Sequence, residues 1–408
     1  MPRLLMRCLL LMLLCLLSVP AIAEEADTVR PEIGKPLQDA QKLLGEHHAP
    51  EALAKVKEAE RVKDRTPYET FLLQQIRGRA LDVAGDSEAA IRDYDAAIAS
   101  GRLTAPQKLL YTKQIAVDYY NLKNYPKAIE ATNRYFKEGG DDDKMRIVLA
   151  QAYFLANDFA NAVKELKAQT EAQERSHQTP PELQLQMLSQ AAQKAGDPAT
   201  TTAGLEKLAS YYPKKEYWSA LLQDIRKRPG YSGRLDLDLG RLRLATGAVR
   251  SPDDYMEAAQ LALADGLPGE ARKIVEQGYA SGSLGTGAEA ERHQRLKTLA
   301  AKSAEEDLKT IDQSATEAAT RKDGTGLVNT GLDYVGYGQF DRGLALIEQG
   351  IQKGGLKYPD DAKLHQGFAY LQAGKKDKAI EAFQTIQGTD ITAGLARAWL
   401  IVARRKAP

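Results

Sequence analysis

The chain has 408 residues, of which 43% are hydrophobic and 27% are charged, as in an ordinary soluble folded protein. Its formal net charge of +1 provides no strong field for nucleic acid or an anionic membrane, so we expect no nucleic-acid partner. Both cysteines, Cys8 and Cys15, lie near the start of the chain, so the rest can form no disulfide and no thiolate metal site.

The first residues have the pattern of a secretory signal peptide. Arg3 and Arg7 precede the apolar run Cys8–Leu17, and Ala21–Ala23 forms a small-x-small cleavage site. We therefore expect cleavage before Glu24, export to the periplasm and no transmembrane segment in the mature chain. An uncleaved anchor is the alternative, but the apolar run is shorter than the roughly 20 residues that span a bilayer.

One sequence pattern occurs twice between Leu109 and Thr170, with a period of 34 residues. Each copy reads as two short amphipathic helices with a polar turn between them. Small residues are expected where the two helices approach closely, and an aromatic residue is expected to fill the core beside them. The corresponding positions are Ala116, Tyr119 and Ala128 in the first copy and Ala150, Tyr153 and Ala162 in the second. A fixed period of this length predicts a helical repeat array.

The spacing of a small residue, Tyr three positions later and Ala nine positions after that resembles the tetratricopeptide repeat family. The resemblance implies an all-α solenoid of helix–turn–helix units, wound into a right-handed superhelix. It is strong in four units and fair in two, and it is weak elsewhere. The strong units begin near Phe71, Leu109, Gly324 and Pro359, and the fair ones near Asp143 and Pro252.

Composition and periodicity predict six segments along the chain. They are a signal peptide (1–23), a flexible leader (24–32), an N-terminal repeat array (33–215), degenerate repeats (216–285), one long charged helix (286–323) and a C-terminal pair of repeats with a capping helix (324–408). Within the degenerate segment, the alternation of Leu235–Leu244 also fits a strand, but the stripe of Leu235, Leu239 and Leu242 favours a helix. The last helix is expected to present a polar outer face, as the end of an array requires.

The sequence contains no recognisable catalytic or cofactor-binding motif. None of the five histidines has a second ligand at metal-binding spacing. The glycine-rich segment Ser281–Gly287 has no preceding strand and no following Lys-Ser or Lys-Thr, so we interpret it as a loop. We expect no metal, no cofactor and no catalysis. A pocket that gathers two titratable groups with strongly perturbed pKa values would favour an enzyme instead.

In the tetratricopeptide repeat family, the first helices of successive units line a groove that takes peptides or partner segments. The resemblance places nine residues of this chain in such a groove: Lys113, Val117, Tyr120, Asn121, Lys144, Ile147, Gln151, Phe154 and Leu155. A known version of the groove clamps a carboxylate with Lys followed four positions later by Asn. Here Val117 follows Lys113, so that clamp is not supported. The alternative is that Tyr120 and Phe154 pack between repeats, as aromatic stripes usually do.

We therefore predict a non-catalytic periplasmic scaffold or adaptor that binds a protein or peptide partner in the cell envelope. The order of motifs resembles secreted repeat proteins of Gram-negative bacteria, some of which accompany TonB-type uptake systems. A small-ligand or glycan-binding solenoid is the alternative, and it would show an enclosed apolar pocket in place of an open groove. The sequence leaves the oligomeric state open.

Overall fold

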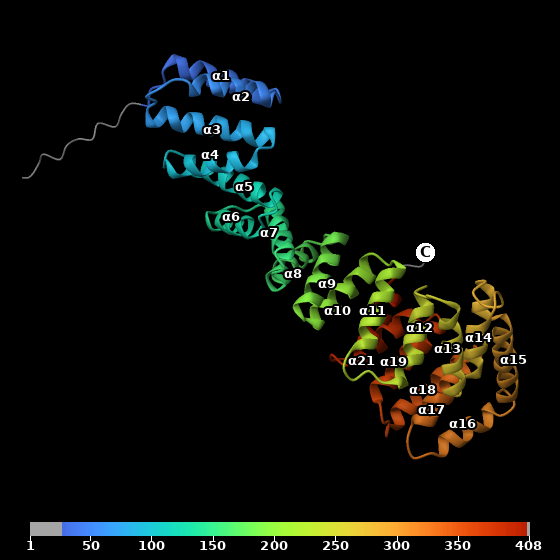
Figure 1. Cartoon of the computed structure of the whole chain (residues 1–408). Helices are drawn as coiled ribbons and strands as arrows, with labels where there is room; N and C mark the ends of the chain where they lie inside the picture. The colour runs from blue at the N-terminus through green and yellow to red at the C-terminus, as the bar shows by residue number, and fades with distance from the viewer. Residues whose placement is uncertain (1–26, 406–408) are drawn as a thin grey trace, which may run out of the picture. The chain divides into compact units, whose positions relative to one another are not determined.

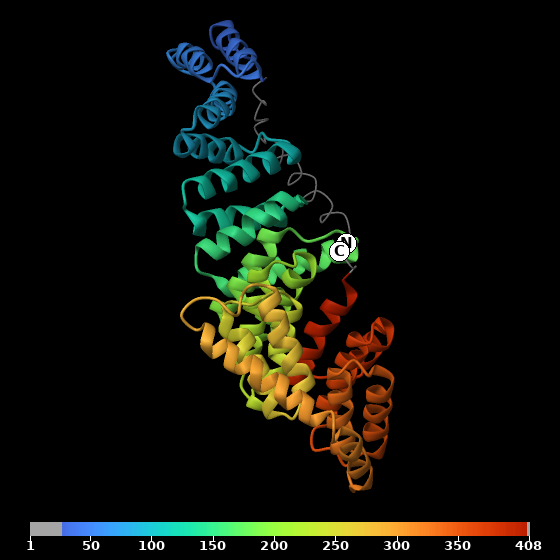
Figure 2. The same cartoon turned by 90° about the vertical axis from the view of Figure 1, so that its right-hand side faces the viewer.

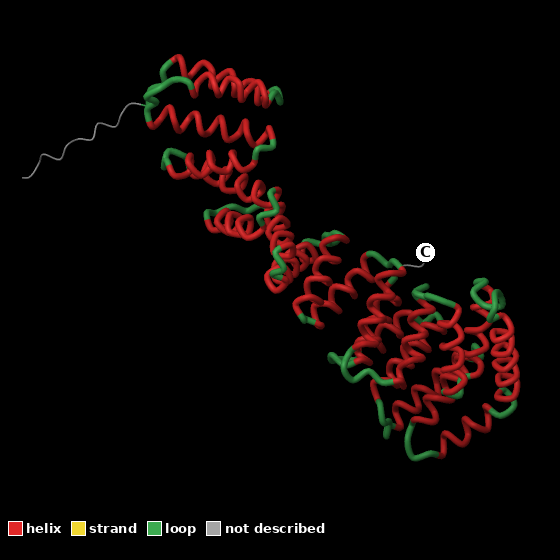
Figure 3. The backbone as a smooth tube through the Cα atoms, viewed as in Figure 1, coloured by secondary structure: helices red, strands yellow, loops and turns green. Residues whose placement is uncertain are grey.

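The computed structural model describes residues 27–405, and every regular element within them is helical (Figure 3). The all-α prediction is thus confirmed for this part of the chain. The predicted signal peptide and its cleavage site lie outside the described residues. Contacts divide the chain into two compact units, Met1–Ala156 and Asn157–Pro408, which we call the N-terminal and C-terminal units.

The division falls inside the segment 33–215, which was expected to form a single array. It follows Ala156, at the turn of the second copy of the repeated pattern. Because each repeat of an array contacts only its neighbours, few contacts cross any one point, and local periodicity does not reveal where such a chain divides.

The N-terminal unit consists of helices that pair with their neighbours in sequence, α1 with α2, α3 with α4 and α5 with α6 (Figure 1). The helices are α1 (Pro31–Gly45), α2 (Ala49–Glu60), α3 (Pro67–Ala84), α4 (Ser87–Ala99), α5 (Ala105–Asn121), α6 (Tyr125–Lys137) and α7 (Asp143–Leu155). Thr66 and Thr104 begin α3 and α5 with reciprocal capping boxes that satisfy the first backbone N–H groups of each helix.

The turns inside the repeats share one local structure. Lys123 adopts a left-handed conformation with φ of 58°, and the side chain of Asn124 then caps α6. Asn157, 34 residues later, has φ of 61°, and Asp158 caps the following helix. The predicted polar turns are confirmed, because Asn and Asp tolerate or cap this geometry at low cost.

The end of the predicted leader is part of the fold, which corrects the expectation of flexibility for 24–32. Helix α1 begins at Pro31, and Arg30 Nη2 lies 2.7 Å from Glu69 Oε2, whose side chain is fully buried. The hydrogen bond from Arg30 lowers the pKa of Glu69 to about 2. Arg102 Nη1 also lies 2.6 Å from Asp27 Oδ1, so ion pairs to distant residues fix the end of this polar segment, and periodicity cannot show them.

The C-terminal unit contains fourteen α-helices between Phe159 and Arg404 and one short 3-10 helix among its described residues. The helices are α8 (Phe159–Arg175), α9 (Glu182–Ala195), α10 (Pro198–Tyr211), α11 (Lys215–Lys227), η1 (Gly233–Leu235), α12 (Asp236–Ala245), α13 (Pro252–Ala264), α14 (Pro268–Ala280), α15 (Ala290–Asp307), α16 (Ile311–Thr320), α17 (Thr325–Gly336), α18 (Phe340–Lys353), α19 (Pro359–Gln372), α20 (Lys376–Gln384) and α21 (Ile391–Arg404). The ambiguous Leu-rich segment forms helix α12, as favoured, and the glycine-rich segment is the loop before α15.

The segment 286–323 forms two helices, not the one long charged helix that was expected. Helix α15 ends at Asp307, and a separate helix, α16, begins at Ile311 and packs against α17. Ile311 and Ala318 are only 3% exposed, and a Cβ built on Gly326 of α17 would lie 3.2 Å from Ala318 Cβ. Burial of these apolar residues favours the change of direction over continuation of the helix.

Helices α17 and α18 approach so closely that glycine is required between them. A Cβ on Gly331 would lie 2.6 Å from the carbonyl oxygen of Gly343, and a Cβ on Gly343 would lie 2.5 Å from that of Gly331. The two glycines thus set the distance between the helices.

The last helix closes the C-terminal unit, which corrects the expectation of a cap with a polar outer face. Helix α21 lies against α19 and α20 and also against α10, α11 and α12 (Figures 1 and 2). Arg397 Nε lies 2.8 Å from Glu206 Oε1 of α10, and Trp399 is 2% exposed. A helix that is apolar on most sides must be buried on most sides.

A pair of carboxyl groups lies between α15 and α17. Asp333 is 5% exposed, and one of its oxygens, Oδ1, has no hydrogen-bond partner among the described residues. Burial, followed by hydrogen bonding and charge repulsion from Asp307, raises the pKa of Asp333 well above its ordinary value. Tyr337 donates a hydrogen bond to Asp307 Oδ2 over 2.8 Å. Asp333 is therefore the member of the pair that retains a proton.

We expect Asp333→Asn to increase stability, and to do so more as the pH rises. The folded state binds a proton that the unfolded state releases above about pH 4, so wild-type stability falls as the pH rises from there towards the raised pKa. The amide needs no proton, so the variant should gain at least about 1 kcal/mol near pH 8 and little near pH 4. Circular-dichroism melting curves between these two values test the prediction.

Asp312→Asn is the matched control. The carboxylate of Asp312 is largely exposed, and hydrogen bonds from Tyr334 and Arg342 lower its pKa, so this change should bring no gain at high pH. If the stability of the wild type and of the Asp333→Asn variant depended equally on pH, the assignment of the retained proton to Asp333 would be contradicted.

Candidate functional site

The structure brings the two halves of the expected groove together within the N-terminal unit. Helices α5 and α7 lie in contact, and Tyr120 donates its hydroxyl hydrogen to Gln151 Oε1 over 3.0 Å. Lys113 pairs with Asp142, the residue that caps α7. The stripes assigned to separate helices are therefore one continuous surface, which we call the α5/α7 surface.

The α5/α7 surface has exposed apolar residues within a polar surround. Ile147 and Leu155 are 42% and 43% exposed. Asn121 and Lys144 are exposed as well, and the remaining members are half-buried: Lys113, Val117, Tyr120, Gln151 and Phe154. Tyr120 also packs edge-on against Tyr125, with ring centroids 5.9 Å apart. Tyr120 thus takes part in packing between helices while keeping part of its ring accessible, and partner binding by this surface stays a prediction.

The small and aromatic positions of the two repeat copies were expected to be buried between helices. The structure confirms this for the alanines and corrects it for Tyr119 and Tyr153. The four alanines at positions 116, 128, 150 and 162 are 0% exposed. Tyr119 and Tyr153 are only half-buried; Lys127 Nζ lies 5.2 Å from the ring of Tyr119, and Asn133 donates to the Tyr153 hydroxyl. Tyr135, 6% exposed, is the buried aromatic of this core. The methyl group of alanine can be fully buried where two helices lie close together. A tyrosine at the same interface is only partly buried, because its hydroxyl group stays near water.

A second candidate site, which the sequence did not predict, lies inside the C-terminal unit around Arg241. Its guanidinium is held by two carboxylates, with Nε 2.7 Å from Glu270 Oε1, Nη2 2.6 Å from Glu270 Oε2 and Nη1 2.8 Å from Asp238 Oδ1. The same group lies 4.5 Å from the ring centroid of Phe368, and His365 Nε2 lies 3.2 Å from Asp238 Oδ2. The cluster joins α12, α14 and α19.

The charges of this cluster are fixed. Burial alone would raise the pKa of Asp238, but His365 and Arg241 outweigh it and lower that pKa to about 2. Burial opposes the charge of Arg241, but Glu270 and Asp238 outweigh it and raise its pKa. These two strong shifts meet the criterion set above for an enzyme, but both move away from neutrality. Asp238 and Arg241 therefore stay charged, and each is stabilised by the opposite charges beside it.

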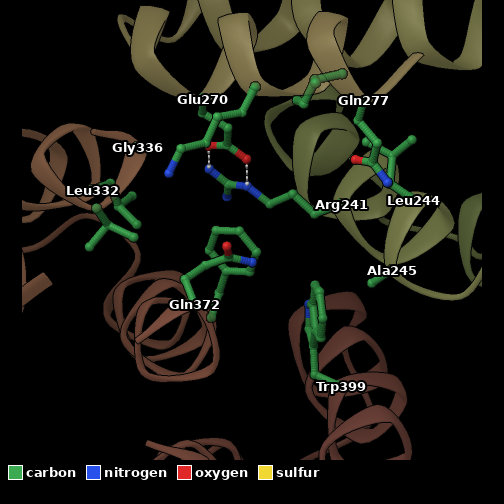
Figure 4. A pocket seen from close by; sticks show the side chains of 13 residues that line it. Arg241, Leu244, Ala245, Glu270, Gln277, Leu332, Gly336, Gln372 and Trp399 are labelled. Carbon is green, nitrogen blue, oxygen red and sulfur yellow. Dashed lines mark hydrogen bonds and ion pairs between the residues drawn. The ribbon is translucent and has the colours of Figure 1, made fainter. Parts of the chain in front are cut away.

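Two cavities flank the cluster and share Arg241 and Leu332 in their walls. One has a volume of about 230 Å³ and a polar lining that includes Asp238, Asn329 and His365. The other, which we call the lumen pocket, has a volume of about 260 Å³. The apolar part of its lining includes Ile274, Val335, Phe368 and Trp399, and the Arg241–Glu270 ion pair lies beside them (Figure 4). Lys273, Gln277 and Gln372 are exposed residues of the same lining.

Sequence reasoning missed this site because its walls come from helices far apart in the chain, α12, α14, α17, α19 and α21. One signal was present: Asp238, Arg241 and Arg243 interrupt the leucine-rich segment that forms α12, and all three are buried. Charged residues are almost never fully buried unless they are paired, so their presence in an apolar helix points to partners elsewhere.

Two further searches concern the described residues alone. No group of three or more His, Cys, Asp or Glu side chains in 27–405 is arranged to hold a metal ion. Within the same range, no helix is both long enough and apolar enough to cross a membrane.

Comparisons with known proteins place the repeats most clearly near the C-terminus. A family model described as tetratricopeptide repeat matches residues 328–394. No curated protein matches. Among solved structures, the chain is 15% identical to Naa15/Naa10 bound to HypK-THB, with a TM-score of 0.31, and the match covers 86% of this chain and 63% of that one.

Two other solved structures cover the chain more evenly. Yeast Tom70 is 11% identical, with a TM-score of 0.24 and coverage of 90% of this chain and 94% of that one. The TPR domain of P58(IPK) is 15% identical, with a TM-score of 0.23 and coverage of 90% and 98%.

The family match coincides with the units predicted from Gly324 and Pro359. It begins in α17 and ends in α21, so it includes the closely packed glycine pair and the whole of α18, α19 and α20. Residues 328–394 are thus similar to the tetratricopeptide repeat, as the sequence resemblance implied for this part of the chain.

Proposed function

We propose that this protein is a non-catalytic periplasmic scaffold that binds a protein partner through the α5/α7 surface. An envelope complex is the setting that the signal-peptide pattern supports, and a TonB-type uptake system is one candidate for it. The tetratricopeptide repeats support a binding role, and the fixed charges around Arg241 favour binding over catalysis.

The observation that carries the proposal is the pair of exposed apolar side chains on α7. Ile147 and Leu155 lie at two ends of a stripe that also contains the half-buried rings of Tyr120 and Phe154. Grouped apolar exposure with a polar rim marks an interaction surface, in which aromatic side chains supply the anchors. The hydrogen bond from Tyr120 to Gln151 joins the two halves of the stripe across the contact between α5 and α7.

A second candidate function, binding of a small ligand, is favoured by the lumen pocket of the C-terminal unit. The sequence alternative called for an enclosed apolar pocket; this pocket is partly open, but most of its lining side chains are apolar. Because this pocket and the α5/α7 surface lie in different units, variants can test the two functions separately.

We expect the double variant Ile147→Asp, Leu155→Asp to lose capture of the partner by at least about tenfold while remaining folded. Both side chains are exposed in the free protein, so each change should alter the free energy of unfolding by less than about 0.5 kcal/mol. The measurement is affinity capture from an envelope extract with tagged full-length protein, followed by quantitative mass spectrometry of the proteins that wild type enriches.

The matched control is Leu299→Asp, which changes an apolar side chain that is 52% exposed on α15. Undiminished capture by the double variant, with loss of capture by Leu299→Asp, would move the partner site to α15. Loss of helicity in the double variant would show that the side chains belong to the core.

We expect the exported protein to begin at Glu24 and to be released in the periplasmic fraction. The reason is that the apolar run of the signal is followed by a small-x-small cleavage site, and it is too short to anchor the chain. N-terminal sequencing of protein from fractionated cells measures this. Recovery of the chain in membranes with Met1 intact would contradict the proposed location.

A further inference from the structure

The lumen pocket is a recess with one side closed by contacts across the interior of the C-terminal unit. Arg241 of α12 lies 4.5 Å from the ring of Phe368 on α19, and Asp238 and His365 join the same two helices. The volume of about 260 Å³ is just below the ~300–1,000 Å³ of common ligand pockets, so it suits a molecule with a single ring.

The interior of the recess offers an apolar surface with a rigid aromatic wall. Ile274, Leu332 and Val335 are each at most 5% exposed. Trp399 stacks on Phe383 with ring planes 7° apart, and its centroid lies 5.5 Å from that of Phe368. Its indole Nε1 has no hydrogen-bond partner within residues 27–405, although the side chain is buried. The wall thus combines apolar area with one unpaired donor.

The lining carries a buried ion pair and one exposed cation, Lys273. The lining contains two cations, Arg241 and Lys273, and one carboxylate, Glu270, so its net charge is +1. Arg241 directs its donors to Glu270 and Asp238, as Figure 4 shows for the first of these, and its charge is matched. Lys273 has no ion-pair partner among the described residues and lies 5.9 Å from the ring of Phe340.

The surroundings of Lys273 favour an anion there. Burial lowers the pKa of Lys273, so part of the hydration of its ammonium group is already lost. The side-chain amides of Gln277 and Gln372 lie at the same rim and can donate hydrogen bonds to the same group. Figure 4 shows Gln372 and Trp399 facing Glu270 across the pocket.

From this geometry we propose that the lumen pocket binds a small organic monoanion with a single-ring apolar body, of the aromatic carboxylate class. The ring lies against the side chains of Phe368, Trp399 and Leu332, and the carboxylate stays at the rim with Lys273 and the two glutamines. This site is separate from the α5/α7 surface and does not depend on the proposed scaffold function.

The first experiment uses Trp399 as a reporter in the full chain. The sequence contains two tryptophans, so Trp218→Phe leaves Trp399 as the single fluorophore. Titration with 3-phenylpropionate should change its emission saturably, whereas acetate, which lacks the ring, should have no effect. Isothermal titration of wild type with the same compound should give the same affinity, which controls for any effect of Trp218→Phe on folding.

Two variants test the two parts of the proposal. Lys273→Gln should weaken binding of 3-phenylpropionate by about fivefold and leave binding of the neutral 3-phenylpropanol unchanged. Ala245→Phe should abolish binding of both, because Ala245 is an exposed residue of the lining and its replacement fills the recess from the rim. Lys375→Gln is the control, since Lys375 pairs with Asp341 outside the lining.

Three results would overturn the proposal. They are the absence of saturable binding of 3-phenylpropionate to folded protein, equal affinity for the acid and the alcohol, and unchanged binding by Ala245→Phe. A fourth is binding of a phenylalanine-containing peptide, capped at both ends, by a protein that fails to bind 3-phenylpropionate. In that case the occupant is a side chain of a protein partner.

Discussion

The packing of α21 against α10, α11 and α12 is the contact on which the architecture of the C-terminal unit depends. It joins residues 191 positions apart through Arg397 and Glu206. In an open array each repeat contacts only its neighbours, and the last helix remains at an end. Here the last helix returns to the middle of the unit, so α12 faces α19, and Arg241 can contact both Glu270 and Phe368.

The buried charges around Arg241 serve orientation more than stability. Removing charges from water costs about as much as the ion pairs return, and breaking such a pair leaves an uncompensated charge. The cluster therefore favours one arrangement of α12, α14 and α19 and creates a cavity on each side. In the described part of the N-terminal unit, helices pair with close neighbours in sequence, and Ile147 and Leu155 of the α5/α7 surface are exposed. The two proposals accordingly assign a macromolecular partner to one unit and a small ligand to the other.

Local signals in the sequence predicted local structure well. The period of 34 residues located the turns at Lys123 and Asn157, and the small residues Ala116 and Ala128 are fully buried as expected. What depends on distant segments was not predictable: the ion pair of Arg30, the burial of α21 and the whole Arg241 cluster. Whether the last helix caps the array or is buried on two sides depends on contacts with distant segments. The periodicity of its own sequence does not contain that information. For the same reason, the sequence did not predict that the long charged helix ends at Asp307. The burial of Ile311 explains why a new helix begins there.

Native-state hydrogen exchange of the full chain, resolved by peptide mass spectrometry, tests the closure by α21 most directly. If α21 is held between α19, α20 and the α10–α12 helices, its amides should be among the slowest to exchange in the C-terminal unit, at rates close to those of α12. The more exposed α15 should exchange faster. Exchange of α21 at the rate of a fraying terminal helix, with α12 still protected, would contradict the closed arrangement.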